Sequence, residues 1–202
     1  MNYKALIIAM LTAVLMAASC LRVGDGFTTE ELALINGTDS TMRVLTIEAP
    51  LDCLILRSVS RDLPVEALAS DEFAKLSRLM VATVTHPSQD GVGIAGPQVG
   101  LNRRIVAVQR FDKEGEPFEV YANIRIVWMS DSLAYGPEGC LSVPERRGEV
   151  LRSQKIVIEY ADRCKAHPNY ISTVRDTVEG FTAVIFQHEI DHLEGVLYID
   201  RI

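Results

Sequence analysis

The sequence predicts a single α+β domain in which mostly antiparallel strands pack around a helix near the C-terminus. Apolar residues recur at helical spacing in residues 70–84 and 181–194. Short runs rich in β-branched residues lie before and between these helices, in a non-alternating order that favours antiparallel pairing. The 202 residues are 48% hydrophobic and 23% charged, which suits one globular domain with a short appendage.

In the first half of the chain, residues 20–42 are expected to be a tether with one helical turn at 30–34, because Gly, Asn and Asp are frequent there. Residues 43–47 are expected to form the first strand, and Pro50 to interrupt the chain before the apolar residues 54–56. Ser70 is the expected N-cap of a helix that ends near Val84, since Thr85-His86-Pro87 cannot continue it.

In the second half, a glycine-rich loop at 91–100 precedes a strand at 105–108 and extended segments at 118–128. Residues 130–139 are expected to form a loop, and 140–143 a short extended piece closed by Pro144. Strands 156–160 and 171–178 are expected to pair with each other. The last helix should end before Gly195, a typical residue just beyond a helix, and 196–199 should form a final strand.

The N-terminus has the pattern of a secretory signal peptide. A short polar region with Lys4 precedes the apolar run 5–18, which is too short to span a bilayer. The end of this run, Leu15-Met16-Ala17-Ala18-Ser19-Cys20, resembles a bacterial lipobox. We therefore expect 1–19 to be removed and Cys20 to carry a lipid that anchors an exported protein to the membrane of the cell envelope; without use of this signal the protein would be cytoplasmic.

The charge and the cysteines set further limits. A formal net charge of −7 argues against a nucleic-acid partner, because phosphate contacts need a basic surface. Besides Cys20 the chain holds Cys53, Cys140 and Cys164. One disulfide and one thiol, or three thiols, are both compatible with this odd number, so a Cys53–Cys164 pair stays open. We expect a monomer.

The main chemical signal is His188-Glu189-x-x-His192 near the end of the chain. Two histidines four residues apart on a helix can hold one metal ion, and the glutamate can take a proton from its water. With Phe181 and Ile185, the histidines fall within an arc of about 60° and are expected to face the core. Buried histidines bonded to the backbone are the alternative, which the paired spacing makes less favourable.

Zinc proteases share this helix but need a third ligand after it. One protease class has a histidine six residues after the second histidine, where this chain has Tyr198. The other needs a glutamate on a later helix, for which too little chain remains. An upstream ligand is therefore required. Cys140 suits it better than His86 or His167, because a thiolate is a strong ligand, although an isolated cysteine is more often merely buried.

Three stretches together resemble peptide deformylase. They are the loop Gly91-Val92-Gly93-Ile94-Ala95-Gly96-Pro97-Gln98, the segment Glu138-Gly139-Cys140-Leu141-Ser142 and the helix end Gln187-His188-Glu189-Ile190-Asp191-His192. Their order and spacing agree with that family over residues 43–202. The loop also matches a dinucleotide-binding fingerprint, but that fingerprint needs a strand before it and a helix after it, the reverse of the order expected here.

The resemblance implies a metal held by Cys140, His188 and His192, with water as the fourth ligand. Glu189 would then be the general base, and the oxyanion would be stabilised by the side-chain amide of Gln98 and the backbone N–H of Leu141. A peptide cleft with a methionine pocket would be lined by Val92, Gly93, Glu138, Gly139, Val184 and Ile185. The family implies Fe²⁺, while a Cys/His₂ set also suits Zn²⁺, Ni²⁺ or Co²⁺.

The expected function is removal of formyl groups from N-formylmethionyl peptides or nascent chains, with release of formate. An inert formyl-peptide-binding lipoprotein and an amidase for another small N-acyl group are the alternatives. Three features depart from the family pattern: Gly96 replaces an alanine and should loosen packing, the usual C-terminal extension is missing after Ile202, and the signal peptide would separate the enzyme from nascent chains.

Overall fold

The computed structural model describes residues 26–163 and 171–202, so Cys20, Cys164 and the expected signal peptide lie outside the described residues. The helices are α2 (Thr29–Asn36), α3 (Pro50–Leu56), α4 (Asp71–Val84) and α5 (Gly180–Leu193), with 3-10 turns η2 (Ala67–Ala69), η3 (Gly96–Val99) and η4 (Tyr198–Asp200). The strands are β1 (Gly93–Ala95), β2 (Ile105–Gln109), β3 (Phe118–Met129), β4 (Leu133–Cys140), β5 (Val143–Ser153), β6 (Lys155–Arg163) and β7 (Ile171–Glu179).

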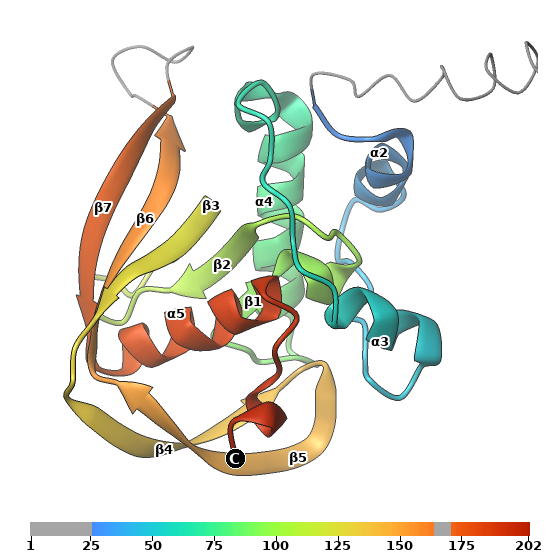
Figure 1. The fold of residues 1–202 in the computed structure, drawn as a ribbon. Coiled ribbons are helices and arrows are strands. Elements are labelled where there is room, and N and C mark those ends of the chain that lie inside the picture. Colours follow the sequence, from blue (N-terminus) through green and yellow to red (C-terminus); the bar gives the residue numbers. More distant parts are fainter. Residues whose placement is uncertain (1–25, 164–170) are drawn as a thin grey trace, which may run out of the picture.

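The strands form two antiparallel sheets. Five of them pair in the order β1-β2-β3-β6-β7, and β4 pairs with β5 in a separate hairpin. Helix α5 lies between the larger sheet and this hairpin, whereas α4 and α2 lie on the other side of the larger sheet (Figure 1). The expected α+β class with mostly antiparallel strands is confirmed.

Strand β2 is buried on both faces and so joins the two cores. Ile105 and Ala107 pack in the cluster that contains the apolar residues of α4, whereas Val106 and Val108 pack with those of α5. Successive side chains of a strand point to opposite faces, which explains this division. The continuous apolar run of β2 thus fixes α5, and with it the histidines, against one face of the sheet.

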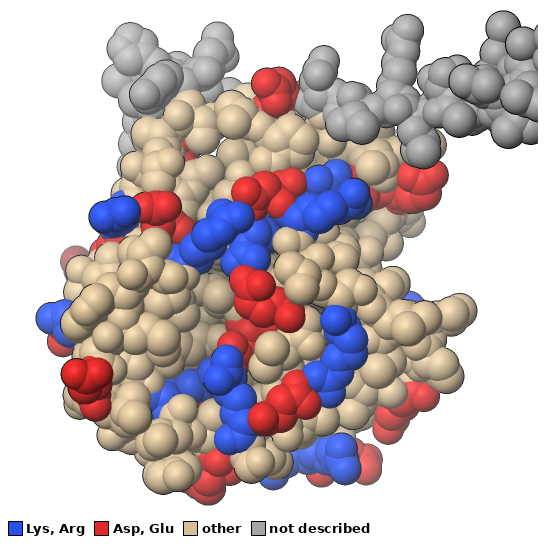
Figure 2. All heavy atoms as spheres, viewed as in Figure 1, with Lys and Arg blue, Asp and Glu red and all other residues tan. Residues whose placement is uncertain are grey.

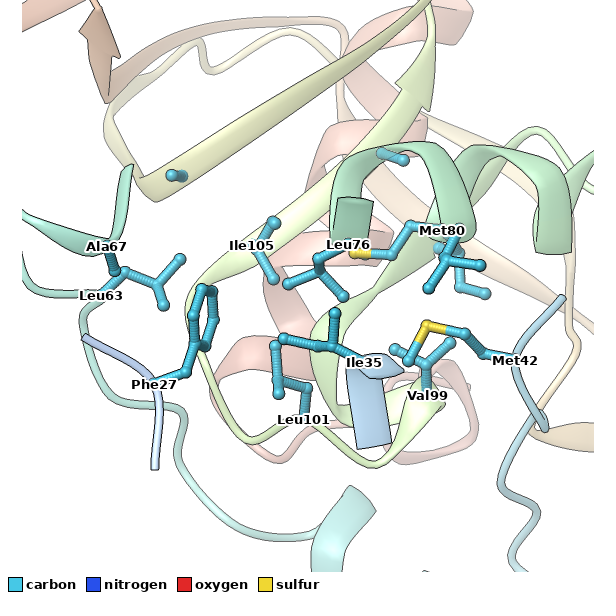
Figure 3. Packing of buried hydrophobic residues seen from close by; sticks show 14 of the residues in the cluster. Phe27, Ile35, Met42, Leu63, Ala67, Leu76, Met80, Val99, Leu101 and Ile105 are labelled. Carbon is cyan, nitrogen blue, oxygen red and sulfur yellow. The ribbon is translucent and has the colours of Figure 1, made fainter. Parts of the chain in front are cut away.

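Residues 26–42 are packed against the domain, which differs from the tether that we expected. Thr28 caps α2, and Glu31 bonds back to its backbone N–H, a capping box that the sequence already carries. Ile35 is fully buried, and Phe27 and Met42 join the same core (Figure 3). An eight-residue helix therefore replaces the single expected turn.

The segment after α2 also differs from its expected form. Residues 43–47 are not a strand, although two of their N–H groups donate to residues of the motifs described above. Leu45 N–H donates to the carbonyl of Gln98 at 2.7 Å, and Ile47 N–H to that of Ser142 at 3.0 Å. Pro50 does not interrupt a structure but begins α3, since the first helical position requires no N–H.

The hairpin β4–β5 is the largest difference from the expected elements. Residues 130–139 were expected to be a loop ending in Pro137-Glu138-Gly139, but they pair with β5 from Leu133 onward. Long-range pairing overrides local preference here. The final strand expected at 196–199 is also wrong, because Tyr198–Asp200 form a 3-10 turn.

The elements with strong local signals agree with the sequence. Ser70 Oγ accepts a hydrogen bond from Phe73 N–H and caps α4. Strands β6 and β7 pair along their whole length, as expected. Helix α5 covers the expected range, and Gly195 adopts φ +71° just beyond it. A side chain at Gly195 would also meet the carbonyl oxygen of Arg57 at 2.4 Å.

Candidate active site

The structure brings Cys140, His188 and His192 together. Their ligand atoms all lie within 4.8 Å of one another, and Cys140 Sγ is 3.2 Å from Nε2 of His192. Cys140 ends β4, and the two histidines lie one turn apart on α5 with ring centroids separated by 5.1 Å. The ligand set therefore comes from two elements that only the tertiary fold places side by side.

These three residues fit a divalent metal ion by their chemistry. One sulfur and two imidazole nitrogens are a usual donor set for zinc and related transition metals. Nδ1 of His188 is held by Glu138 at 2.8 Å, which leaves Nε2 for the centre. Oε2 of Glu189 is buried without a hydrogen-bond partner among the described residues, and such an orphaned buried oxygen is typical of a catalytic group.

Glu138 orients His188 and is itself held by a buried arginine. Arg152 donates to both oxygens of Glu138, at 2.7 and 3.0 Å. Burial raises the pKa of Glu138, but the hydrogen bonds with His188 and Arg152 outweigh it and hold the pKa at about 2. An ionised carboxylate behind a metal-ligating histidine fixes the tautomer and the ring orientation. We had expected Glu138 to line the peptide cleft; its carboxylate supports a ligand as well.

Two further residues of this network, Arg152 and Asp191, were not expected from the sequence. Arg152 also donates to Asp191 at 2.6 Å, and Asp191 is bonded in turn by Arg201 close to the chain end. A signal for Asp191 was present, since an acid between the two histidines on a buried helix needs a cation. No local sequence pattern indicated a role for Arg152, because its role depends on the pairing of β4 with β5, which was not expected.

Glu189 lies beside the histidines and is 4% exposed. Burial raises its pKa to about 7, which suits a group that must both accept and return a proton near neutral pH. A methyl group on Gly93 would lie 2.4 Å from Glu189 Oε1. Gly93 is therefore required for the space that Glu189 occupies, which gives a physical role to the second glycine of the loop.

The side-chain amide of Gln98 has a fixed orientation. Its oxygen accepts from Ala95 N–H at 2.8 Å, so its nitrogen must face the other way. That nitrogen lies 3.5 Å from Cys140 Sγ and 3.2 Å from Ser142 Oγ. The N–H donors thus point toward the ligand cluster, as a donor to a developing oxyanion would have to do.

A cavity of about 640 Å³ opens above these residues. Its lining includes every substrate-cleft and catalytic residue that we expected: Val92, Gly93, Gln98, Glu138, Gly139, Leu141, Val184, Ile185 and Glu189, together with Cys140 and His188. It also includes residues that we did not expect, namely Gln89, Asp90, Gly91, Pro137, Val143, Glu145, Arg146, Arg147 and Phe181. His192 is not part of the lining and is almost fully buried.

The helix face that carries the histidines is buried at Ile185 and His192, as expected, but it also borders the cleft, which Ile185 and His188 line. Phe181 is 56% exposed and contacts Phe111, with ring centroids 5.3 Å apart. Residues on the other faces of α5, such as Phe186 and Leu193, are fully buried. The helix is therefore enclosed on most sides, which a single apolar arc cannot describe.

Gly96 does not loosen the packing of the loop. An added methyl group would lie 2.7 Å from the carbonyl oxygens of both Leu101 and Arg103. The chain has closed onto the space that an alanine side chain would need, so the expectation of looser packing is wrong. Gly96 is required by the close approach of the 101–103 segment.

A cleft that combines a metal-ligand cluster with a buried carboxylate of raised pKa can activate water against an otherwise stable amide. The fold and the site thus define the chain as a metal-dependent amide hydrolase. The family model for polypeptide deformylase matches residues 41–202. The chain belongs to the polypeptide deformylase family.

Relatives and solved structures agree with this assignment. The peptide deformylase of Leptospira biflexa is 38% identical over 155 residues, which cover 73% of this chain and 82% of that protein. That of Caulobacter vibrioides is 39% identical over 163 residues, with 79% and 87% covered. Among structures, the Met-Ala-Ser-bound class I type b peptide deformylase of Acinetobacter baumannii gives a TM-score of 0.69 at 30% identity, covering 82% of this chain and 100% of that one. The Thermotoga maritima enzyme gives 0.67 at 31% identity, with 80% and 97% covered.

Proposed function

We propose that the chain hydrolyses the formyl C–N bond of N-formylmethionyl peptides and releases formate and the free amine. The observation that carries this proposal is the convergence at one cleft: three ligand atoms lie within 4.8 Å of one another, and both Glu189 and Gln98 line the same cavity. Val92, Val184 and Ile185 supply an apolar wall for the methionine side chain.

The residues divide the reaction between them. A divalent ion bound by Cys140, His188 and His192 would supply a Lewis acid that makes water more acidic. Glu189 takes the proton from the attacking water and returns it to the leaving amine nitrogen. The amide of Gln98 and the backbone N–H of Leu141 donate to the formyl oxygen as it gains charge. Burial of Glu189 keeps its basicity close to what this double role requires.

The test is formate release from a formyl-Met peptide by the metal-loaded protein. Wild type should release formate, and Glu189→Gln should lose about 10²–10⁴-fold in kcat, the usual contribution of a general base. An acetyl-Met peptide of the same sequence separates a deformylase from a general small-acyl amidase. Equal inactivity of wild type and Glu189→Gln on the formyl peptide would contradict the proposal.

The identity of the metal is a separate part of the proposal. Family resemblance favours Fe²⁺, while the thiolate and imidazole donors also fit Zn²⁺, Ni²⁺ and Co²⁺. Elemental analysis of protein purified without added metal distinguishes these ions. If the protein works outside the cytoplasm, a ferrous ion at a thiolate is exposed to oxidation, and we then expect zinc.

The cellular location is also proposed and rests on sequence. The lipobox-like ending at Cys20 supports export and lipid anchoring. Within residues 26–163 and 171–202, no helix is long and apolar enough to cross a membrane. Membrane fractionation with a labelled fatty acid, on wild type and Cys20→Ala, tests the anchor. Label on wild type alone supports it, and absence of label on both contradicts it.

A further inference from the structure

The turn after Cys140 contains a bulge that the catalytic residues do not explain. Gly139 pairs with Arg147, but the next residue, Cys140, pairs with Val143, which leaves residues 144–146 of β5 without partners on β4. Glu145, at the centre of this bulge, has φ +60°. Bulges next to active sites redirect side chains, and a positive φ at a non-glycine residue is retained where the surrounding structure requires it.

The bulge places two adjacent arginines at the cleft. Arg146 and Arg147 are both exposed and both line the cavity. A methyl group on Gly139 would lie 3.6 Å from Cγ and 3.7 Å from Nη1 of Arg147, so this side chain runs along the residue that precedes Cys140. The two arginines are thus the basic groups beside the floor of the cleft.

Neither arginine is neutralised by the protein. Within the part of the chain that the structure describes, neither forms a salt bridge. Asp90 and Glu145 also line the cleft, but they are not paired with Arg146 or Arg147. Elsewhere on the surface, basic side chains lie close to acidic ones (Figure 2), as with Lys155 and Glu179, whose charged atoms are 2.6 Å apart.

We propose that Arg146 and Arg147 form a carboxylate-binding subsite, so that the enzyme favours short formyl peptides with an anionic group two or three residues after the methionine. This inference rests on the proposed function. An extended peptide advances about 3.3 Å per residue, so the terminal carboxylate of a formyl tripeptide lies roughly 10 Å from the formyl carbon. Arg147 is the cross-strand partner of Gly139, next to Cys140, so an extended arginine side chain can reach that carboxylate.

A free C-terminal carboxylate distinguishes a short peptide from a nascent chain, whose C-terminus is far from its formyl group. Guanidinium groups bind carboxylates with two parallel hydrogen bonds, so a C-terminal carboxylate beside these arginines is bound more tightly than an uncharged group. The subsite is open to solvent, so the selectivity is moderate and depends on salt. An Asp or Glu side chain in the same place offers the same chemistry, and the experiment separates the two sources.

The experiment compares kcat/KM for formyl-Met-Ala-Ser with a free carboxylate and with a C-terminal amide. Wild type should prefer the carboxylate about two- to fivefold at low salt. The preference should fall toward one at 1 M salt. It should also fall toward one in the Arg146→Gln/Arg147→Gln double variant, because the loss of kcat/KM is larger for the acid than for the amide. Formyl-Met-Ala-Asp-amide against formyl-Met-Ala-Asn-amide shows whether a side-chain carboxylate is accepted equally.

Arg175→Gln is the matched control, because it removes one exposed cation from β7, at the opposite edge of the larger sheet from β1. It should keep the wild-type preference. Equal rates on acid and amide in wild type, or an unchanged preference in the double variant, overturns the inference. Turnover of the amide reports on the proposed function alone. If neither peptide is turned over, calorimetric binding of Met-Ala-Ser as acid and as amide still tests the subsite.

Discussion

Glu138 Oε2 lies 2.8 Å from Nδ1 of His188, while both carboxylate oxygens of Glu138 accept hydrogen bonds from the buried Arg152. The same residue thus fixes a proposed metal ligand and neutralises a buried cation. Arg152 also donates a hydrogen bond to Asp191. One ionic network therefore joins the C-terminal end of α5 to the hairpin β4–β5. The metal-ligand geometry is therefore coupled to the packing of the two elements.

Replacing Glu138 with Gln should weaken metal binding. The amide keeps the shape, but it cannot be an ionised acceptor for His188, and loss of such an outer partner typically costs about 10–100-fold in metal affinity. Competition with a chelator measures this affinity. Glu149→Gln, an exposed change on β5 opposite Pro137, is the control and should leave the affinity unchanged. Equal metal affinities in the Glu138 variant and wild type would refute a supporting role.

Gly93→Ala should reduce activity more than stability. The added methyl group would lie 2.4 Å from Glu189 Oε1, so the carboxylate has to move. A displacement of the base by about 1 Å can cost on the order of 10²-fold in kcat. Gly136→Ala is the control, because a side chain there meets nothing within 4 Å. Thermal unfolding and formate release are measured on both, and similar activities would show that Glu189 tolerates the shift.

Gln98→Glu tests the amide donor separately from the loop structure. The carboxylate can still accept from Ala95 N–H, which the native oxygen does at 2.8 Å, but it has no N–H to donate. Loss of one oxyanion donor typically lowers kcat by about 10²–10³-fold. Gln154→Glu, the same change at the carbonyl of Arg152, controls for added charge. Metal content is measured in parallel, and a kcat within twofold of wild type would remove Gln98 from the mechanism.

Acid should destabilise the fold through Glu31. Burial raises the pKa of Glu31, but hydrogen bonds from Arg103 and Thr28 outweigh it and lower the pKa below its ordinary value. The unfolded state then binds the proton more readily, so the contribution is complete above the unfolded pKa of about 4.5 and is lost as the pH falls through the lower folded pKa. The pair is only slightly exposed, at 9% and 12% for the two side chains.

Urea unfolding of wild type and Glu31→Gln measures this contribution. At pH 7 the variant should lose roughly 1.5–3 kcal/mol of unfolding free energy, the range for hydrogen bonds to charged groups. Near pH 3 the difference should shrink. Glu30→Gln, an exposed neighbour on α2, should be neutral at both pH values. A pH-independent loss in the Glu31 variant would show that packing, not charge, stabilises α2 on the domain.

Local chemistry in the sequence determined α4, α5 and the β6–β7 pair. Each has a signal within its own residues, such as the Ser70 cap of α4 or Gly195 just beyond α5. The candidate metal ligands and the proposed base were also indicated by the sequence, because His188, Glu189 and His192 carry their spacing on one helix and Cys140 lies in a recognisable segment. The capping box at Thr28 and Glu31 was readable too, although the glycines and polar residues around it indicated a tether.

Only the tertiary structure decided what lies around these residues. The hairpin β4–β5 forms although residues 133–140 contain two glycines and a proline, because strand pairing depends on a partner distant in sequence. From that hairpin come Arg152 behind Glu138 and the two arginines at the cleft. The sequence by itself determined the reactive groups, since their spacing along one helix is local. The hydrogen bonds that hold these groups in place, and the charge of the cleft, depend on contacts between residues distant in sequence, which no local pattern encodes.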